Sequence, residues 1–337
     1  MPTEVLVTIP FSETLISQIA NLSSAINVTA ITAQTASEIS AEIWARTEIL
    51  YTGNVLPAPE QVPALRWIQF HFAGIDRYTD EPIIKKAGVQ VTTLSGAAAP
   101  QMAEHVLAMM LALSRKLPAL IMSQKKSEWP RDRFDRYAPF ELNGKTIGIV
   151  GYGSIGRQVA RLLQPFGVRI LATKRNAMST RDEGYIVEGL GDPQGDLVHR
   201  LYPAQALKSM LKECNIVLVT TPLTRETEGL LNDAAFAVLK PDAYLIDVSR
   251  GGVVNHEDLI NALKSGRLAG AALDVFPEEP LPSSNPLWQM SSVILTPHIS
   301  GGSLHYNERA AALFIENLRR YLANQSIYNI FDPKRGY

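Results

Sequence analysis

The sequence predicts an α/β protein of two domains, the second of which is built on a doubly wound parallel sheet. Three observations carry this prediction. The chain has 337 residues, which is more than one ordinary hydrophobic core accommodates. Short β-rich runs alternate with helical patterns through the second half, as in a parallel sheet with helices on both faces. A glycine motif near the middle of the chain joins one such run to a helical pattern.

The N-terminal part begins with a predicted strand, from Met1 to Pro10, that carries an acid at Glu4. This order differs from the charged and then apolar layout of a signal peptide, and no apolar run approaches the ~20 residues that span a bilayer. The formal net charge is −1 and basic residues are scattered, which gives no electrostatic footprint for nucleic acid or an anionic membrane. We therefore predict a cytoplasmic protein that binds a small molecule and neither nucleic acid nor membrane.

The run from Ile147 to Gly156 is the most informative stretch, because an apolar strand-like segment leads directly into Gly-x-Gly-x-x-Gly. Gly151 allows a sharp turn off the strand, and Gly153 lets the backbone approach a pyrophosphate without a Cβ in the way. Gly156 lets the following helix pack close to the sheet. The glycines alone would also fit an ordinary turn between a strand and a helix. The strand before them and the helix after them favour a dinucleotide site.

A helix should follow the glycines, from Ser154 to about Phe166, and Gly167 should end it. The N–H groups of its first turn, at Ser154 and Ile155, and the positive end of its dipole would face the phosphates of the dinucleotide. We therefore expect both residues to bind the cofactor.

Polar side chains follow the later strands. Five further β-rich runs are predicted, at residues 169–173, 216–220, 243–248, 269–275 and 293–295. In open parallel sheets, ligands bind outside the carboxyl ends of the strands. The residues placed there include Arg250, Glu279 and His298. An arginine, a carboxylate and a histidine at one sheet edge can bind and reduce a carbonyl group.

Each of these three side chains has a chemical role in this hypothesis. The guanidinium of Arg250 would hold a carboxylate and polarise the adjacent C=O. His298 would supply the proton, and Glu279 would orient its imidazole. Singly, each could instead be structural, as a strand-end cap, a surface acid or a packed loop histidine. Together, behind a dinucleotide motif, they favour catalysis.

Metal chemistry is not expected. The single cysteine, Cys214, stands before an apolar run and is predicted to be a buried structural thiol. His71, His105 and His256 are predicted to pack in the core or lie on the surface, and no pair of these histidines has metal-ligand spacing.

The residues resemble the D-isomer-specific 2-hydroxyacid dehydrogenases, a family that includes glyoxylate/hydroxypyruvate reductases, phosphoglycerate dehydrogenases and D-lactate dehydrogenases. The resemblance covers nearly the whole chain. Its motifs are Phe72-Ala73-Gly74-Ile75-Asp76, Ala103-Glu104-His105, the glycine motif, Thr221-Pro222-Leu223-Thr224, Asp247-Val248-Ser249-Arg250-Gly251-Gly252, Asp274-Val275-Phe276-Pro277-Glu278-Glu279-Pro280 and Thr296-Pro297-His298-Ile299-Ser300-Gly301.

The resemblance implies roles for matching positions. Arg250 looks like the family's substrate-binding arginine, Glu279 like the partner of the histidine, and His298 like its acid/base. Asp274 looks like the residue that contacts the nicotinamide carboxamide. The remaining positions assigned to the cofactor are Thr221, Pro222, Val248 and Ser249, and those assigned to the substrate carboxylate are Ala73, Gly74 and Ile75.

The resemblance also implies the domain organisation. A flavodoxin-like substrate domain would comprise residues 1–103 and 299–337, and a Rossmann cofactor domain, residues 104–298, would be inserted in it. The helical pattern from Ala103 to Lys125 carries more apolar surface than one face needs. We predict a homodimer through the 103–130 region, with an intrachain core as the alternative.

The end of the second cofactor-domain strand departs from the pattern of NAD-using enzymes. They place an acid there, about 20 residues past the glycines, to bind the ribose 2′-hydroxyl, whereas this chain has Lys174 and Arg175. Two cations would attract the 2′-phosphate of NADP. We predict NADP, with NAD as a possible cofactor; the alternative is that both side chains point to solvent. The acid-rich segment 178–205 is predicted to be a surface loop and a poor phosphate clamp.

The predicted function is reduction of a small 2-oxo acid to a D-2-hydroxy acid by hydride transfer from NAD(P)H, with NADPH favoured. Two alternatives stay open. Some proteins of this fold are dinucleotide-sensing transcriptional corepressors, and others are dehydrogenases of formate or phosphite. A substrate panel separates the three.

Overall fold

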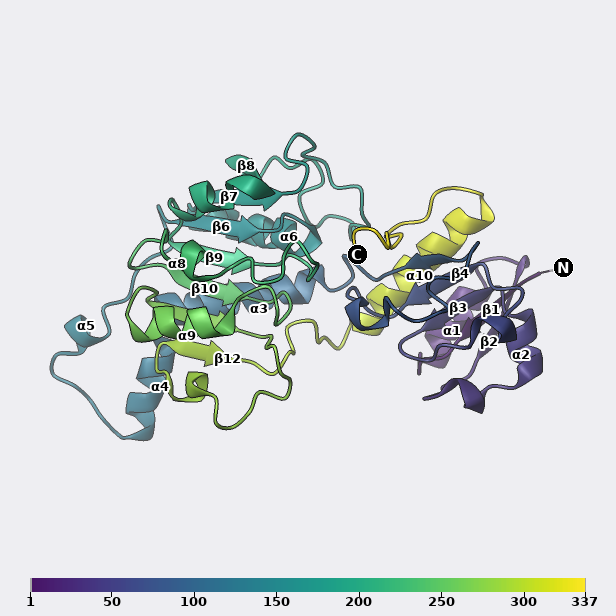
Figure 1. Ribbon diagram of the computed structural model, residues 1–337, viewed down its shortest axis with the longest axis horizontal. Coiled ribbons are helices and arrows are strands. Elements are labelled where there is room, and N and C mark those ends of the chain that lie inside the picture. The colour runs from purple at the N-terminus through teal and green to yellow at the C-terminus, as the bar shows by residue number, and fades with distance from the viewer. Residues whose placement is uncertain (1, 337) are drawn as a thin grey trace. The chain divides into compact units, whose positions relative to one another are not determined.

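The computed structural model describes residues 2–336, and by its internal contacts the chain divides into two compact units (Figure 1). Unit 1 consists of Met1–Ala98, Glu183–Val187 and Ser303–Tyr337, and unit 2 of Ala99–Asp182 and Glu188–Gly302. The first boundary lies before Ala99 rather than at 103/104, because the helix that begins there packs against a helix of unit 2. The short piece 183–187 was not expected in unit 1.

Unit 1 is a five-stranded parallel sheet in the order β2-β1-β3-β4-β5. Its strands are β1 (Thr3–Val7), β2 (Ile26–Ala30), β3 (Ile49–Thr52), β4 (Trp67–Phe70) and β5 (Gln90–Thr92). Its helices are α1 (Glu13–Ala20), α2 (Ala41–Arg46) and α10 (Tyr306–Leu322), with short 3-10 turns η1 (Ala36–Glu38), η2 (Pro59–Gln61) and η3 (Asp76–Tyr78).

The C-terminal helix completes the core of unit 1. Phe314 and Leu318 of α10 are fully buried and pack in one cluster with Val7 and Trp67 of the sheet. The ring of Phe314 lies 4.7 Å from that of Tyr51 in an edge-on contact. Apolar burial of this kind stabilises the unit, and it requires both ends of the chain.

Unit 2 is a seven-stranded parallel sheet in the order β12-β11-β10-β9-β6-β7-β8. Its strands are β6 (Thr146–Val150), β7 (Arg169–Lys174), β8 (Arg200–Pro203), β9 (Ile216–Val219), β10 (Tyr244–Asp247), β11 (Gly270–Leu273) and β12 (Val293–Leu295). Its helices are α3 (Ala99–Ser114), α4 (Leu117–Lys125), α5 (Arg133–Arg136), α6 (Ser154–Leu163), α7 (Leu207–Leu211), α8 (Asp233–Phe236) and α9 (His256–Lys264), with 3-10 turns η4 (Gln164–Phe166), η5 (Ala204–Ala206) and η6 (Pro286–Gln289).

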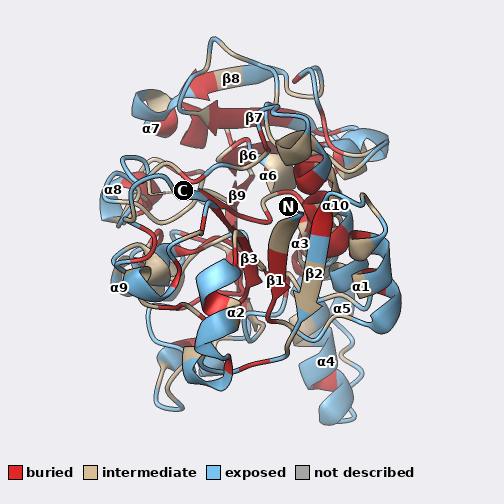
Figure 2. Ribbon diagram, turned by 90° about the vertical axis from the view of Figure 1, so that its right-hand side faces the viewer, coloured by how far each residue is buried: buried red, intermediate tan, exposed pale blue. Residues whose placement is uncertain are grey.

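Helices cover both faces of the unit 2 sheet, which confirms the doubly wound α/β prediction. Successive strand residues point to opposite faces. On β9, Val217 packs in the cluster that includes α7, α8 and α9, whereas Leu218 packs in the cluster that includes α3 and α6. Both faces of the strand are therefore apolar. In Figure 2 the strands β3 and β9 are red, as buried elements, and β1 is tan where it begins and red beyond.

The helical pattern predicted from Ala103 to Lys125 is broken in the structure. Lys116 adopts the left-handed conformation with φ 55° between α3 and α4. Pro118 lies in the first turn of α4, where its missing N–H costs no helical hydrogen bond. Among residues 2–336, no single helix combines the length and apolar composition needed to cross a membrane; only α3 and α4, bent by 67°, meet both criteria when counted together.

Cys214 is buried, as predicted. Its Sγ donates a hydrogen bond to the carbonyl oxygen of Met210. Burial raises the pKa of the Cys214 thiol to about 12, so the group stays a protonated, unreactive thiol. Gly148 on β6 leaves the space that the sulfur occupies, because a Cβ there would lie within 2.3 Å of it.

Candidate active site

His298 and Glu279 form a hydrogen-bonded pair at the carboxyl edge of the unit 2 sheet. His298 follows β12 and Glu279 follows β11. The Nδ1 of His298 lies 2.8 Å from Oε2 of Glu279. The other carboxylate oxygen, Oε1, accepts a hydrogen bond from the backbone N–H of Phe276 at 3.0 Å. With Nδ1 held by the carboxylate, Nε2 is the imidazole atom left to exchange a proton with a ligand.

Asp274 shapes the loop that carries His298. Its carboxylate is buried, and Oδ1 accepts hydrogen bonds from the Thr296 hydroxyl at 2.6 Å and the Ile299 N–H at 2.9 Å. Its Oδ2 accepts from the N–H of Ser300 at 3.0 Å. The backbone oxygen of Asp274 accepts from the N–H of His298, whose φ of 50° is left-handed. One acid thus fixes a strained turn around the histidine.

His105 on α3 reaches the same loop. Its Nε2 lies 3.3 Å from the hydroxyl oxygen of Thr296. Because the single hydroxyl proton of Thr296 goes to Asp274, Nε2 of His105 must carry the hydrogen in this contact. The prediction of a packing or surface role for His105 omitted this contact. Its place in the Ala103-Glu104-His105 motif was the available signal.

Arg250 lies at the same edge, after β10. Its Nη1 donates to the backbone oxygen of Ser249 at 2.8 Å. Asp247, the last residue of β10, is fully buried, and its Oδ1 accepts a hydrogen bond from the N–H of Ser249 at 3.0 Å. Burial raises the pKa of the Asp247 carboxyl to about 7, against the opposing effect of the Ser249 hydrogen bonds and with a further rise from the charge of Asp274. In the sequence, Asp247 stands out only as the first residue of the motif that contains Arg250.

The glycine motif forms a cradle of the right shape for a pyrophosphate. Gly151 has a φ of +99°, and a Cβ there would lie 2.9 Å from the N of Thr221. At Gly156 a Cβ would lie 2.8 Å from Cγ2 of Ile149. At Gly153, in contrast, a Cβ would point into open space. The backbone is therefore crowded on the sheet side and open on the side where a dinucleotide would lie, which fits the group.

Helix α6 starts at this cradle. Gly153 is its N-cap residue and makes no side-chain cap hydrogen bond. The first turn begins with Ser154 and Ile155, so their N–H groups and the positive end of the helix dipole are directed to the position of an anion. These residues could hold the phosphates of NAD or NADP.

The remaining predicted cofactor residues lie along the same edge of unit 2. Lys174 is the last residue of β7 and Arg175 follows it. Thr221 and Pro222 follow β9, and Val248 and Ser249 follow β10. The predicted substrate residues belong to unit 1, in the segment after β4, where Ala73 is exposed and Ile75 is buried.

Three polar residues beside the glycine motif were missed by sequence reasoning. Tyr152, Arg157 and Asp192 are all buried and contact one another. Two features of the sequence could have indicated them. Arg157 is a charged residue among the apolar positions of α6, and Asp192 is an acid in the segment 178–205, which was expected to be exposed to solvent. Among residues 2–336, no group of three His, Cys, Asp or Glu side chains is arranged to hold a metal.

Comparison with known proteins gives a consistent picture. The family model described as "D-isomer specific 2-hydroxyacid dehydrogenase, NAD binding domain" matches residues 107–300. Glyoxylate reductase of Thermofilum pendens is 35% identical over 261 residues, 77% of this chain and 72% of that protein. Glyoxylate reductase of Pyrococcus furiosus is 34% identical over 286 residues, 81% and 80% of the two chains.

Solved structures agree with these sequence relatives. A D-isomer-specific 2-hydroxyacid dehydrogenase of Xanthobacter autotrophicus, solved with NADPH and MES, has a TM-score of 0.80 at 28% identity, and the match covers 100% of both chains. A protein of the same family from Aeromonas salmonicida has a TM-score of 0.78 at 28% identity over 99% of this chain and 100% of its own.

Proposed function

The chain belongs to the D-isomer-specific 2-hydroxyacid dehydrogenase family, and on that basis we propose that it reduces a small 2-oxo acid to a D-2-hydroxy acid with NADPH as the preferred cofactor. The family makes it an NAD(P)-dependent oxidoreductase of the glyoxylate reductase type. The observation that carries the residue assignment is the 2.8 Å contact between His298 and Glu279 at the sheet edge that also bears Arg250.

His298 is the proposed proton donor. When bound, a reduced nicotinamide would supply the hydride for the carbonyl carbon. As that carbon is reduced, Nε2 of His298 donates a proton to the carbonyl oxygen, which becomes the hydroxyl of the product. Glu279 holds Nδ1 and stabilises the charged imidazole before the transfer. The neutral imidazole then takes up a proton from solvent for the next turnover.

Arg250 is the proposed anchor of the 2-oxo acid. Its planar guanidinium matches the geometry of a carboxylate and stays charged at every working pH. The same group stabilises negative charge that develops on the carbonyl oxygen, an effect that grows where water is excluded. The bond from Nη1 to Ser249 fixes one edge of the guanidinium. In unit 1, the N–H groups of Ala73, Gly74 and Ile75 are proposed to bind the substrate carboxylate.

Asp274 is proposed to contact the nicotinamide carboxamide in addition to its structural role. Three hydrogen bonds to its carboxylate leave one acceptor direction on Oδ2 by the usual capacity of a carboxylate. Val248 and Ser249 are proposed to line the cofactor from β10, and Thr221 and Pro222 from β9. Each of these assignments rests on position along one sheet edge and on the family's motifs.

The preference for NADPH rests on Lys174 and Arg175, which stand where NAD-using enzymes carry an acid. Two cations at this place favour a 2′-phosphate and leave a 2′-hydroxyl without its acceptor. The Xanthobacter protein, a structural neighbour at 28% identity, was solved with NADPH. NADH is expected to be the weaker cofactor.

A homodimer through the 103–130 region is proposed from the apolar surface of α4. Its exposed side chains are Leu117, Leu120, Ile121 and Met122, and Trp129 just beyond the helix is 85% exposed. Apolar groups gathered on one exposed helix are typical of a surface that another protein covers. A second copy of the chain is the occupant that the family implies.

The experiment that tests the proposed function follows the oxidation of NADPH and NADH with glyoxylate, hydroxypyruvate, pyruvate and phenylpyruvate in parallel. We expect turnover of at least one 2-oxo acid, with a lower KM for NADPH than for NADH. Tight binding of a dinucleotide without turnover of any of the four acids would contradict the proposal and favour a sensor, or a dehydrogenase of another small substrate.

A further inference from the structure

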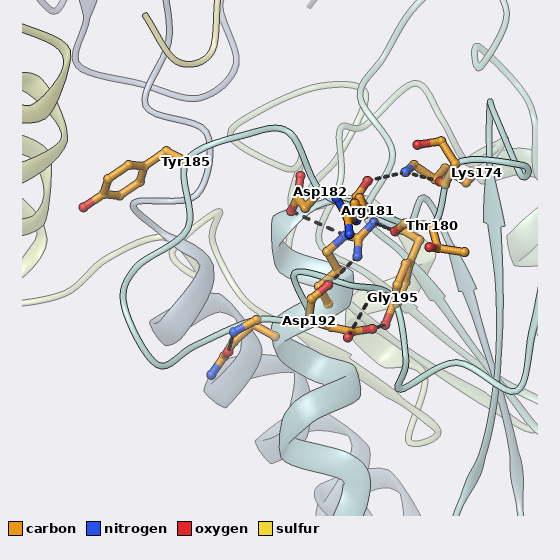
Figure 3. A network of polar contacts seen from close by, with 12 residues as sticks. Lys174, Thr180, Arg181, Asp182, Tyr185, Asp192 and Gly195 are labelled. Carbon is orange, nitrogen blue, oxygen red and sulfur yellow. Dashed lines mark hydrogen bonds and ion pairs between the residues drawn. The ribbon is translucent and has the colours of Figure 1, made fainter. Parts of the chain in front are cut away.

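The segment between β7 and β8 contains no helix or strand, yet buried polar contacts tie it to the glycine motif and to α6 (Figure 3). Arg157 of α6 is 1% exposed and Asp192 of the segment is 4% exposed. Charged groups are rarely buried to this extent unless they are paired and hydrogen-bonded. The expectation of a surface loop was therefore wrong for this part of 178–205, because the carboxylate of Asp182 pairs with the buried Arg157 and the carboxylate of Asp192 is buried among hydrogen-bond donors.

The carboxylate of Asp192 binds the second half of the segment, residues 195–197. Oδ1 accepts hydrogen bonds from the N–H groups of Gly195 and Asp196 at 3.1 and 2.9 Å. Oδ2 accepts from the N–H of Leu197 at 3.1 Å and from the hydroxyl of Tyr152 at 2.6 Å. Burial, with help from Asp192, raises the pKa of Tyr152 far above its ordinary value, so its hydroxyl remains a donor. The segment is thereby fastened to the residue between the first two glycines.

Arg157 binds the first half of the segment, at Thr180 and Asp182. Its Nη2 donates to the carbonyl oxygen of Thr180 at 2.6 Å, and its Nη1 donates to the carbonyl oxygen of Asp192. Its Nε lies 3.4 Å from Oδ2 of Asp182, and its guanidinium stacks 4.6 Å from the ring centre of Tyr152. One rigid, fork-shaped group thus fixes two separate stretches of the segment at once.

The tripeptide 179–181, which we call the clamp, lies between Arg157 and Lys174. The carbonyl of Thr180 is bound by Arg157, whereas the carbonyls of Ser179 and Arg181 accept hydrogen bonds from Nζ of Lys174 at 2.6 and 2.9 Å (Figure 3). Gly195 lets the two halves of the segment meet, since a Cβ there would lie 2.6 Å from the carbonyl oxygen of Thr180. Arg157 and Lys174 therefore bind neighbouring carbonyls of the same tripeptide.

We propose that the clamp holds the ammonium of Lys174 in place for the 2′-phosphate of NADPH, so that Arg157 and Asp192 are positioning residues for cofactor selection. This inference rests on the proposed function. A free lysine side chain has a flexible stem and loses rotamer entropy when it binds a phosphate. Carbonyl contacts made in advance remove most of that loss. This smaller loss of entropy strengthens binding only of a ligand that carries the 2′-phosphate.

The test measures binding of 2′,5′-ADP, which carries the 2′-phosphate, and of 5′-AMP, which lacks it, by titration calorimetry without substrate. Arg157→Lys keeps the charge but replaces the three nitrogen atoms that contact Thr180, Asp192 and Asp182 by a single ammonium. Since hydrogen bonds to a charged group are lost, we expect the Kd of 2′,5′-ADP to rise about 10-fold or more. The Kd of 5′-AMP should rise less than about twofold, within the scatter of a remote substitution. Tyr152→Phe removes a single hydroxyl and should give a smaller change in the same direction.

Arg161→Gln is the matched control. Arg161 lies on the exposed side of α6 and donates to the segment only at the carbonyl of Gly191, at 3.3 Å, so both Kd values should stay unchanged. An equal rise of the two Kd values in Arg157→Lys would overturn the inference, because the segment would then only support the glycine motif that both ligands use. If that variant does not fold, the same comparison in Tyr152→Phe decides. A wild-type protein that binds 2′,5′-ADP no better than 5′-AMP would instead refute the proposed NADPH preference itself, and this inference with it.

Discussion

The hydroxyl of Thr296 donates a hydrogen bond to the buried carboxylate of Asp274 at 2.6 Å. The same carboxylate accepts the N–H groups of Ile299 and Ser300, so the turn that presents His298 is organised by one buried acid. Positioning of a catalytic group within a fraction of an ångström is a large part of enzymatic rate enhancement. The acid and the histidine should therefore be coupled energetically.

Thr296→Val tests this coupling. Valine has nearly the shape of threonine but leaves one acceptor of Asp274 without its donor, which should lower the free energy of unfolding by about 1–3 kcal/mol. Because the loop then loses its fixed geometry, kcat should fall about 10-fold, with the KM for NADPH little changed. Urea unfolding and steady-state kinetics measure both. A fully stable and fully active variant would show that the loop does not need this contact.

Asp247→Asn tests the buried acid at the end of β10. Burial raises the pKa of Asp247 to about 7 in the folded protein, whereas an unfolded chain has an aspartate pKa of about 3.9. Between these values the folded state holds a proton that the unfolded state has released, so the free energy of unfolding decreases as the pH rises through this window.

Asparagine keeps an acceptor for the N–H of Ser249 and does not titrate. The fall in unfolding free energy between about pH 4 and pH 7 should be smaller in the variant, by up to on the order of 4 kcal/mol. Urea unfolding across that pH range measures the difference. Two parallel curves, with the same pH dependence for the variant and the wild-type protein, would argue against a raised pKa at this position.

Arg175→Ser tests cofactor preference at the residue that follows Lys174. Loss of one cation near the 2′-phosphate should raise the KM for NADPH about 10-fold and leave the KM for NADH nearly constant, because a charge-assisted contact contributes ~1.5–3 kcal/mol. Arg169→Ser is the control: it removes the same charge from the exposed start of β7, where Arg169 pairs with Glu213. An unchanged ratio of the two KM values in Arg175→Ser would remove this residue from phosphate binding.

Ile121→Asp tests the proposed dimer. A carboxylate in the centre of a desolvated apolar contact costs several kcal/mol, which should separate the subunits. Sedimentation should then report a mass near 37.0 kDa instead of twice that value. Gln325→Asp adds the same charge on an exposed part of unit 1 and should leave the dimer intact. A wild-type protein that sediments as a monomer would refute the proposed interface.

The sequence was sufficient to predict the architecture of unit 2 and the sheet edge at which the candidate active site lies. Strand and helix periods alternate clearly, and in a parallel sheet all strand ends that lead to ligands share one edge. The helix expected from Ser154 to about Phe166 is found as α6 followed by a 3-10 turn. Local patterns decided these features, so they could be predicted.

Contacts between distant residues could not be predicted. Arg157 lies on α6, and the carbonyl groups that it binds belong to Thr180 and Asp192. Backbone carbonyls have no residue identity, so nothing in the sequence marked them as partners. Asp182 and Asp192 suggested solvent exposure for the same reason, because their partners, Arg157 and the backbone N–H groups of residues 195–197, are not marked in the sequence. Asp274 likewise binds backbone N–H groups of Ile299 and Ser300 that any residue could provide.

The proposed mechanism requires that His298 donates the proton and that the carboxylate of Glu279 holds the imidazole of His298 in place. The most direct measurement compares kcat for glyoxylate in wild-type protein, His298→Ala and Glu279→Gln, with NADPH binding followed separately by fluorescence; if the panel identifies a different substrate, that acid replaces glyoxylate. We expect both variants to bind NADPH as the wild-type protein does, and kcat to fall by about 10²–10⁴ in His298→Ala and by less in Glu279→Gln. A His298→Ala variant with wild-type kcat would show that His298 is not the proton donor.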